Sequence, residues 1–291
     1  MRAKNMTART RIGVVDYLNA RPLEYGLEQG LGADSIELSH DVPARLADRM
    51  AEGQLDVGLL PVIELARMPE MELVPGLGIV TRGAARSVLL VSKVPIDEVR
   101  CVALDGESRT SNALIQVLFA RVWGRRPEFR IGRSRLSHAL AECDAAVRIG
   151  DKALFETPPD NCKVFDLGQV WTHGTGLPFV YAAWLARPGV MTRELYRMLH
   201  ESRRLGLRNI DAIAADYRWN GAGNLELARA YLSENILFRL GAAELEAMQL
   251  FFASAAELGL IDRAPEIRMA FERWTECHET AVRALRPQEN A

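Results

Sequence analysis

Long hydrophobic runs are missing from this 291-residue sequence, although 48% of its residues are hydrophobic. No stretch approaches the ~20 apolar residues that cross a bilayer. The first eleven residues are basic and polar, and the strand-like segment after them lacks the apolar core and small-residue cleavage site of a secretory signal. We therefore expect a cytoplasmic protein that does not contact membranes, with a disordered tail ahead of Met6, an alternative start.

A surplus of charge of one sign is missing as well. The 36 Lys and Arg residues are balanced by 38 Asp and Glu residues, and the formal net charge is -2. This balance gives no global field that would attract nucleic acid or anionic lipid. A small molecule is therefore the expected partner.

Cysteine is scarce. The four cysteines, Cys101, Cys143, Cys162 and Cys277, lie too far apart for a CxxC metal or redox motif. Four cysteines in a chain of this length are not a disulfide framework. We expect them to be reduced thiols.

Short catalytic motifs are also missing. The sequence contains no GxGxxG, no GxxxxGK[ST], no GxSxG and no HExxH. Nucleotide binding, acyl transfer and zinc hydrolysis therefore have no local support. We expect neither a metal nor a cofactor.

Strand-like and helix-like segments alternate from Ile12 onward. Apolar or alternating runs at residues 12–20, 35–42 and 55–61 predict strands. Pro22 opens a predicted helix between the first two, and Pro43 opens the next, which ends at Gly53, where a residue tolerant of φ > 0 is favoured. This order predicts the α/β class, with helices covering a sheet.

The alternation is interrupted near Pro95, where a second strand–helix series begins. The apolar segment 177–186 has strand composition and would carry the chain back, after which amphipathic helices follow. We predict a large lobe of residues 1–94 and 178–291 and a small inserted α/β lobe of residues 95–177. Hinged binding proteins have this plan, with a ligand cleft between the lobes.

The most informative segment is 104–119, where a strand ends and hydroxyl residues open an apolar-periodic helix. Free N–H groups at a helix N-terminus, together with Ser108, Thr110 and Ser111, suit a carboxylate or phosphate. Ser and Thr are also ordinary helix N-caps. Both interpretations of the segment remain open. Of the arginines near the candidate segments, Arg21, Arg86 and Arg109, we favour Arg109 for pairing with a substrate carboxylate.

Three further segments place polar side chains where the predicted cleft would lie. Asn19 follows the first strand, Ser87 follows the Arg82–Gly83 turn, and Asp151 leads from a strand end into a helix. Each has a purely structural alternative: an Asn that satisfies its own turn, a plain hairpin, and a helix cap. The sequence alone does not choose between these alternatives.

A Gly-rich loop is predicted at residues 171–179, where the chain returns to the large lobe. It includes Thr175, Gly176 and Leu177 between two aromatic residues. Such a loop wraps a ligand or simply bends the chain. His173 is the only histidine in these candidate segments, and we assign it no catalytic role.

Six motifs together resemble the chorismate dehydratase family, in order and in spacing, from residue 12 to about 187. They are Tyr17-Leu18-Asn19-Ala20-Arg21-Pro22-Leu23, Asp56-Val57-Gly58-Leu59-Leu60-Pro61, Ser87-Val88-Leu89-Leu90, Asp105 through Ser111, Ile149-Gly150-Asp151 and Gly176-Leu177-Pro178-Phe179. Each motif is weak alone, but their shared register makes the match specific. The resemblance implies a two-lobed type II periplasmic-binding-protein fold.

The resemblance also implies a reaction: chorismate loses water to give 3-[(1-carboxyvinyl)oxy]benzoate, in the futalosine route to menaquinone, without a cofactor. Asn19 and Ser87 match family active-site positions and would be catalytic. The remaining candidates, predicted to bind substrate, are Ser108, Arg109, Thr110, Ser111, Asp151, Thr175, Gly176 and Leu177. No protein base emerges from the motifs, and the enolpyruvyl carboxylate of the substrate is the base we favour; Asp151 is a weaker candidate.

Two rival functions are compatible with the same sequence. One is a non-enzymatic protein that binds or senses a small carboxylate, because fold alone does not determine function. The other is the related 1,4-dihydroxy-6-naphthoate synthase of the same pathway, which uses a cleft histidine, for which only His173 is available here. The oligomeric state is not readable from the sequence.

Overall fold

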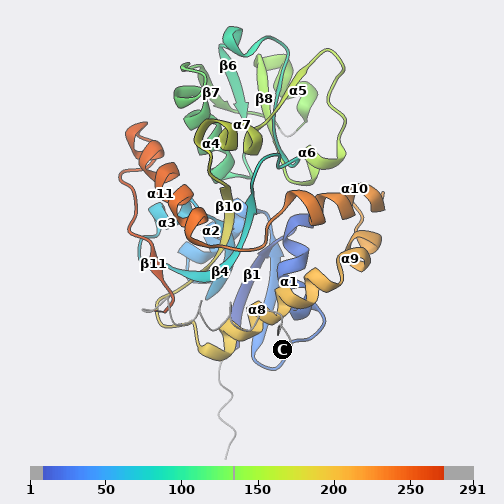
Figure 1. The fold of residues 1–291 in the computed structure, drawn as a ribbon, viewed down its shortest axis with the longest axis vertical. Coiled ribbons are helices and arrows are strands. Elements are labelled where there is room, and N and C mark those ends of the chain that lie inside the picture. The colour runs from blue at the N-terminus through green and yellow to red at the C-terminus, as the bar shows by residue number, and fades with distance from the viewer. Residues whose placement is uncertain (1–8, 134, 272–291) are drawn as a thin grey trace, which may run out of the picture.

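The computed structural model describes residues 9–133 and 135–271 as two lobes, each built on its own sheet (Figure 1). The tail predicted ahead of Met6 and Cys277 lie outside the described residues. The predicted α/β class and two-lobed architecture are confirmed.

The large lobe, in the lower half of Figure 1, contains a six-stranded mixed sheet. Its strands in spatial order are β11 (Arg268–Met269), β4 (Glu72–Thr81), β10 (Phe179–Ala186), β3 (Val57–Pro61), β1 (Thr10–Val15) and β2 (Ile36–Asp41). Every residue of β3 is buried, as is typical of a strand covered on both faces. Strand β10 runs antiparallel to both β3 and β4 and carries the chain back into this lobe.

Two helices connect the parallel strands β1, β2 and β3. They are α1 (Arg21–Glu28) and α2 (Pro43–Ala51). Pro22 and Pro43 lie in the first turns of these helices, and Gly53, with φ of +78°, follows the second. The helix starts and the stop predicted from the sequence are therefore confirmed.

The small lobe contains a five-stranded sheet. Its strands in spatial order are β7 (Glu128–Ile131), β6 (Cys101–Leu104), β8 (Ala145–Ile149), β5 (Val88–Ser92) and β9 (Lys163–Asp166). Its helices are α4 (Arg109–Arg121), α5 (Leu136–Glu142), α6 (Asp151–Phe155) and α7 (Leu167–Thr175). The short 3₁₀ turn η2 (Ile96–Glu98) lies between β5 and β6. A second 3₁₀ turn, η1 (Leu18–Ala20), lies in the large lobe between β1 and α1.

The chain crosses between the lobes after β4 and again before β10. Because β5 hydrogen-bonds to β8 and β9, the first crossing falls before Val88 and not at residue 95, where it was predicted. From its sequence, β5 was predicted to belong to the large lobe, because the composition of a strand does not reveal its partner strands. Ser87 consequently lies on the crossing segment itself.

The remaining helices all belong to the large lobe. They are α3 (Glu64–Arg67), α8 (Arg193–Arg208), α9 (Ile210–Asp216), α10 (Leu225–Ala230), the π-helical turn η3 (Tyr231–Asn235) and α11 (Ala242–Glu257). Helix α8 packs on α1, and a Cβ on Gly206 would lie only 2.1 Å from the carbonyl oxygen of Pro22. Ser202 of α8 accepts a hydrogen bond from the N–H of Gly26 at 3.0 Å. This contact fixes α1, and with it the turn that carries Asn19.

Three aromatic side chains fill the region where the chain re-enters the large lobe. Trp171, Phe179 and Phe251 meet edge to face, with ring centroids between 5.1 and 6.3 Å apart. The indole N–H of Trp171 donates to the carbonyl oxygen of Pro178 at 2.9 Å. The aromatics that flank the predicted loop are thus core residues.

Cys101 and Cys143 are joined by a disulfide, with their Cα atoms 4.9 Å apart. The prediction of four reduced thiols was therefore wrong for this pair. Strand β6 begins at Cys101 and pairs with β8, which begins just after Cys143, so the sheet brings together two residues 42 positions apart. Cys162 is a free thiol.

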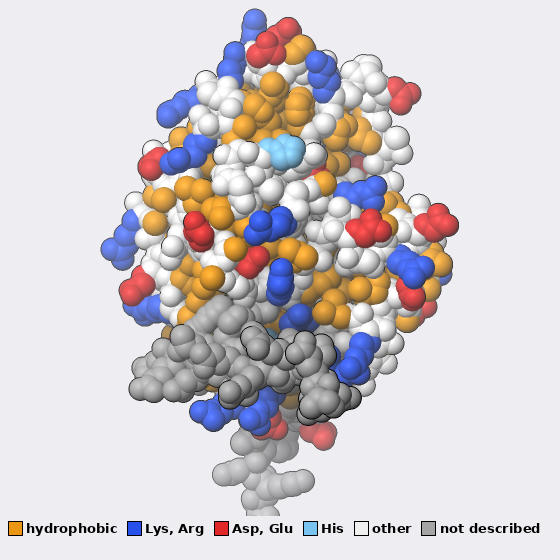
Figure 2. Space-filling view, in the orientation of Figure 1, with side chains coloured by type: hydrophobic (Ala, Val, Ile, Leu, Met, Phe, Trp, Pro, Cys, Tyr) orange, Lys and Arg blue, Asp and Glu red, His pale blue; other side chains and the backbone are white. Residues whose placement is uncertain are grey.

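On the face shown in Figure 2, basic and acidic side chains are interspersed over both lobes. Within residues 9–133 and 135–271, no helix is both long enough and apolar enough to span a membrane.

Candidate active site

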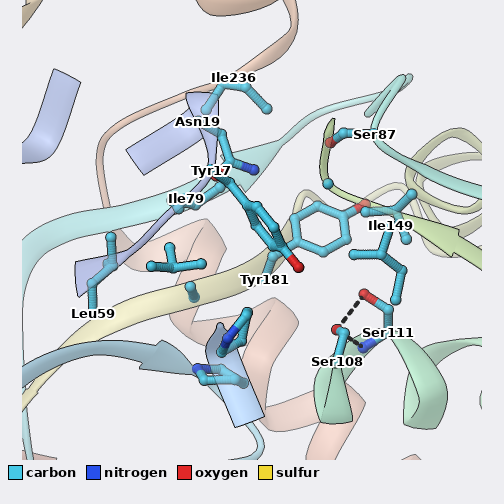
Figure 3. Close-up of a pocket in the computed structure, with 16 residues that line it drawn as sticks. Tyr17, Asn19, Leu59, Ile79, Ser87, Ser108, Ser111, Ile149, Tyr181 and Ile236 are labelled. Carbon is cyan, nitrogen blue, oxygen red and sulfur yellow. Dashed lines mark hydrogen bonds between the residues drawn. The ribbon is translucent and has the colours of Figure 1, made fainter. Parts of the chain in front are cut away.

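A cavity between the two lobes is lined by residues from both (Figure 3). Its empty volume is about 550 Å³, including the part open to solvent. The polar residues that line it are Tyr17, Asn19, Ser87, Ser108, Ser111 and Tyr181. The apolar walls come from β1, β3, β4, β5, β8 and β10, from the start of α2 and from Ile236, and include Leu59, Ile79 and Ile149.

Asn19 and Ser87 lie at one end of this cavity and share one neighbour, Tyr231. The hydroxyl of Tyr231 donates to Oγ of Ser87 at 2.7 Å, and Nδ2 of Asn19 donates to the Tyr231 hydroxyl at 3.1 Å. Asn19 lies on η1 and Ser87 on the crossing segment, whereas Tyr231 begins η3. Three segments far apart in sequence therefore meet in one hydrogen-bonded chain.

Ser108 and Ser111 lie at the other end, at the N-terminus of α4. Ser108 is the N-cap and accepts a hydrogen bond from the N–H of Ser111 at 3.4 Å, and their hydroxyls are 3.0 Å apart. Ser108 therefore caps the helix, and both side chains also line the cavity, so ligand binding by this segment stays a prediction. The positive end of the helix dipole is directed at the same place.

Thr110 and Arg109 do not line the cavity. Thr110 accepts a hydrogen bond from the N–H of Ile63 at 3.3 Å. The guanidinium of Arg109 pairs with Asp48 at 2.6 Å and with the buried Glu64 at 3.2 Å. Both residues therefore join the small lobe to the large lobe.

Asp151 also joins the lobes. Its carboxylate accepts a hydrogen bond from the N–H of Leu18 at 3.3 Å and another from the hydroxyl of Tyr217. Burial raises the pKa of Asp151 to about 6, against the opposing effect of these two hydrogen bonds. The residue adjoins the cavity through Gly150 but is not among the residues that line it.

Tyr17 closes the cavity from the large lobe. Its hydroxyl donates to Glu107 of the small lobe at 3.2 Å, and Lys152 pairs with the same carboxylate at 2.7 Å. Gly150 faces the ring of Tyr17 with φ of +62°, and a Cβ there would lie 2.9 Å from the ring. A side chain at position 150 would therefore collide with Tyr17 in this closed arrangement.

The predicted Gly-rich loop is helix α7 over most of its length, so that prediction was wrong. Asp166 caps the helix by accepting from the N–H of Gln169 at 3.0 Å, and Gly176 ends it with φ of +74°. Thr175 turns its hydroxyl back to the carbonyl oxygen of Trp171 at 2.8 Å. Thr175, Gly176 and Leu177 do not line the cavity, and His173 is exposed on α7.

The other two arginines considered from the sequence lie outside the cavity lining as well. Arg21 pairs with Glu28 at 2.7 Å and with Asp16 at 2.5 Å, and the N–H of Arg86 donates to Asp166 at 2.6 Å.

One group of described side chains, Glu24, Glu28 and His40, is close enough to share a metal ion. Arg21 already lies against both carboxylates, 2.7 Å from Glu28 and 3.2 Å from Glu24. A guanidinium therefore already pairs with both carboxylates, and none of the three side chains lines the cavity.

Three tyrosines at the site were not among the residues predicted from the sequence. Tyr17 and Tyr181 occur in segments that had been noted, so their position beside candidate residues was a usable signal. Tyr231 lies 144 residues from Ser87 and 212 from Asn19, within a segment predicted only as an amphipathic helix. No local pattern identifies it.

A ligand cavity enclosed between two α/β lobes defines the class of periplasmic-binding-protein-like folds. The chain is similar to the periplasmic aliphatic sulphonate binding protein SsuA from Escherichia coli, with a TM-score of 0.62 and 16% identity over 92% of each chain. Residues 10–257 match the family described as menaquinone biosynthesis. The chain belongs to this family.

Two curated relatives indicate where in the family the chain lies. It is 30% identical over 222 residues to a chorismate dehydratase from Thermus thermophilus, covering 70% of this chain and 79% of the relative. It is 28% identical over 254 residues to a chorismate dehydratase from Campylobacter jejuni, covering 85% of this chain and 98% of the relative. The resemblance predicted from the sequence is confirmed.

Proposed function

We propose that this protein is a lyase that removes water from chorismate and forms 3-[(1-carboxyvinyl)oxy]benzoate. One observation carries the proposal: the cavity of this menaquinone-biosynthesis family member is lined, among the described residues, by an amide, five hydroxyls and apolar side chains, with no charged side chain. Such a cavity supplies hydrogen bonds to an anion. Its described lining includes no carboxylate, imidazole or amine that would act as an acid or a base.

The ring carboxylate of chorismate is assigned to the N-terminus of α4. When the proton leaves C3, negative charge spreads through the ring alkene onto this carboxylate. The hydroxyls of Ser108 and Ser111 and the helix N-terminus would stabilise that charge as it develops. One well-placed donor of this kind contributes about 3–4 kcal/mol to lowering a barrier.

The enolpyruvyl carboxylate of the substrate is assigned the role of base. Held beside C3 by the ether link, it reaches the proton intramolecularly, where effective molarity is high. Removal from water without a paired cation favours its protonated form and so raises its basicity. The carboxylate of Asp151, the protein group considered for this role from the sequence, is occupied by Leu18 and Tyr217.

Asn19 and Ser87 are assigned to the C4 hydroxyl. As the C4–O bond breaks, the electron pair of the broken C3–H bond forms the new ring double bond, and the departing hydroxide combines with the C3 proton as water. No oxidant or reductant is needed, and the aromatic product supplies the driving force. Donors directed at the departing oxygen would stabilise its charge.

The pathway, the cellular location and the absence of a cofactor are part of the same proposal. We assign the enzyme to the futalosine route of menaquinone biosynthesis and to the cytoplasm, working without a cofactor. The rival role of a binding or sensing protein is supported only by the fold shared with SsuA. The naphthoate-forming alternative required His173, which is exposed on α7.

The proposal is tested by incubating chelator-treated protein with chorismate, alongside Asn19→Ala and Ser87→Ala. A product lighter by one water, with kcat reduced by roughly 10²–10³-fold in the two variants, is expected. Chorismate bound tightly but returned unchanged would support the binding role instead. Normal turnover by both variants would remove Asn19 and Ser87 from the catalytic assignment.

A further inference from the structure

A buried tyrosine from the C-terminal part of the chain contacts both residues assigned to catalysis. Tyr231 is 1% exposed and bonds to Ser87 at 2.7 Å and to Asn19 at 3.1 Å. From these contacts we propose that Tyr231 is a positioning residue, which fixes the rotamers of Asn19 and Ser87 and orients the Ser87 hydroxyl as a donor into the cavity. The activity tests of this inference rest on the proposed function.

The direction of the hydrogen bonds follows from the proton inventory of the three groups. An amide nitrogen only donates, so the Tyr231 oxygen accepts from Nδ2 of Asn19. The single hydroxyl proton of Tyr231 is then given to Oγ of Ser87. Ser87 accepts this bond, which leaves its own proton for a partner in the cavity. The bonds therefore run one way, from Asn19 through Tyr231 to Ser87.

The environment of Tyr231 keeps its hydroxyl protonated. Burial raises the pKa of the phenol above its ordinary value, so Tyr231 stays a neutral donor at neutral pH. Oδ1 of Asn19 is buried without a hydrogen-bond partner among the described residues. The side chain of Asn19 is thus held through its nitrogen.

The same π-helical turn holds the crossing segment at a second point. Asn235 of η3 donates to the carbonyl oxygen of Ala84 at 3.1 Å, and Leu237 pairs with Val80 of β4 through two backbone hydrogen bonds of 2.8 and 3.0 Å. A π-turn changes the phase of a helix and occurs often at functional sites. None of these contacts involves the Tyr231 hydroxyl, so we expect the backbone to keep its position when that hydroxyl is removed.

The variant Tyr231→Phe removes one oxygen from this arrangement. We expect kcat for chorismate to fall about 10- to 100-fold, with KM changed less than about threefold, because a misplaced group costs rate more than affinity. Tyr25→Phe on α1 is the matched control, since it loses a hydroxyl away from the cavity, and should keep the wild-type kcat. Thermal unfolding of both variants shows whether either loses stability.

A double-mutant cycle separates positioning from a general structural effect. In a Ser87→Ala background, Tyr231→Phe should lower kcat by a smaller factor than in the wild-type background, because one of the two groups that it positions is already gone. If the two single-variant losses of kcat multiply in the double variant, the proposal is overturned. A wild-type kcat for Tyr231→Phe would overturn it as well.

A crystal structure of Tyr231→Phe tests the positioning role independently of turnover. A changed rotamer of Ser87 or Asn19 is expected, and unchanged rotamers of both would overturn the proposal. If the wild-type protein fails to convert chorismate, the proposed function fails, and this structure still decides the role of Tyr231.

Discussion

The backbone N–H of Leu18 donates a hydrogen bond to the carboxylate of Asp151 across the two lobes, over 3.3 Å. Leu18 immediately precedes Asn19, and Asp151 immediately follows Gly150, which faces the cavity. This bond therefore holds the turn of a residue assigned to catalysis against the small lobe. The hydroxyl of Tyr217 donates to the same carboxylate.

Stability should depend on pH through Asp151. Burial raises its pKa in the folded protein to about 6, from 3.8, so between pH 4 and 6 the folded state holds a proton that the unfolded chain has lost. The free energy of unfolding therefore falls as pH rises through this window. Relative to Asp151→Asn, the wild-type protein should lose on the order of 2–3 kcal/mol between pH 4 and pH 7, measured by urea unfolding. A difference that stays constant with pH would contradict the assignment.

Ser108 should affect both stability and substrate binding. Ser108→Ala removes an N-cap, which costs about 1 kcal/mol, and also removes a hydroxyl from the cavity. Thr192 is the matched control, because it caps α8 by accepting from the N–H of Leu195 at 3.1 Å and does not line the cavity. Both variants should lose similar stability in denaturant, but only Ser108→Ala should lower kcat/KM, by about tenfold or more. Equal kcat/KM values would limit Ser108 to capping.

Arg109 should act on lobe closure. Arg109→Gln breaks the ion pairs with Asp48 and Glu64 that join the lobes, so the open form should become more populated. We expect KM for chorismate to rise about tenfold, and the radius of gyration of the ligand-free protein to increase in small-angle scattering. Arg204→Gln, which breaks an exposed pair with Glu201 on α8, should change neither. An unchanged KM with an unchanged radius would show that these pairs do not govern closure.

Gly150 should be required for the closed state. Gly150→Ala introduces a Cβ that would lie 2.9 Å from the Tyr17 ring, at a φ of +62°. Gly189→Ala is the control, because that glycine has φ of +74° and open space around it. Both variants should lose about 1 kcal/mol or more of stability from strain, and only Gly150→Ala should weaken chorismate binding, measured by calorimetry. Similar affinities in the two would mean that the clash is relieved without opening the lobes.

Local signals predicted most of the fold. Pro22, Pro43 and Gly53 mark helix ends through backbone restrictions that act within a few residues, and the structure confirms them. Helix α7 was missed because Gly168 and Gly174 within it lower helix propensity. That helix is stabilised by the packing of Trp171 and the cap of Asp166, of which only the cap is visible in sequence.

The candidate site was predictable only in part. Asn19 follows a strand end, Ser108 and Ser111 open a helix, and Ser87 directly precedes a strand, so their places in the topology bring them toward one cavity. The partners of Arg109 are Asp48 and Glu64, 61 and 45 residues away, and Tyr231 is still further from its own partners. Such long-range pairs depend on tertiary packing and have no local signature.

The proposed reaction removes the C3 proton and the C4 hydroxyl from one substrate. Chorismate deuterated at C3 tests it most directly, by mass detection of the product formed by the chelator-treated protein. The expected product carries no deuterium, because it forms by loss of one HDO molecule. A product that keeps the deuterium, or labelled chorismate returned unchanged, would contradict the claim.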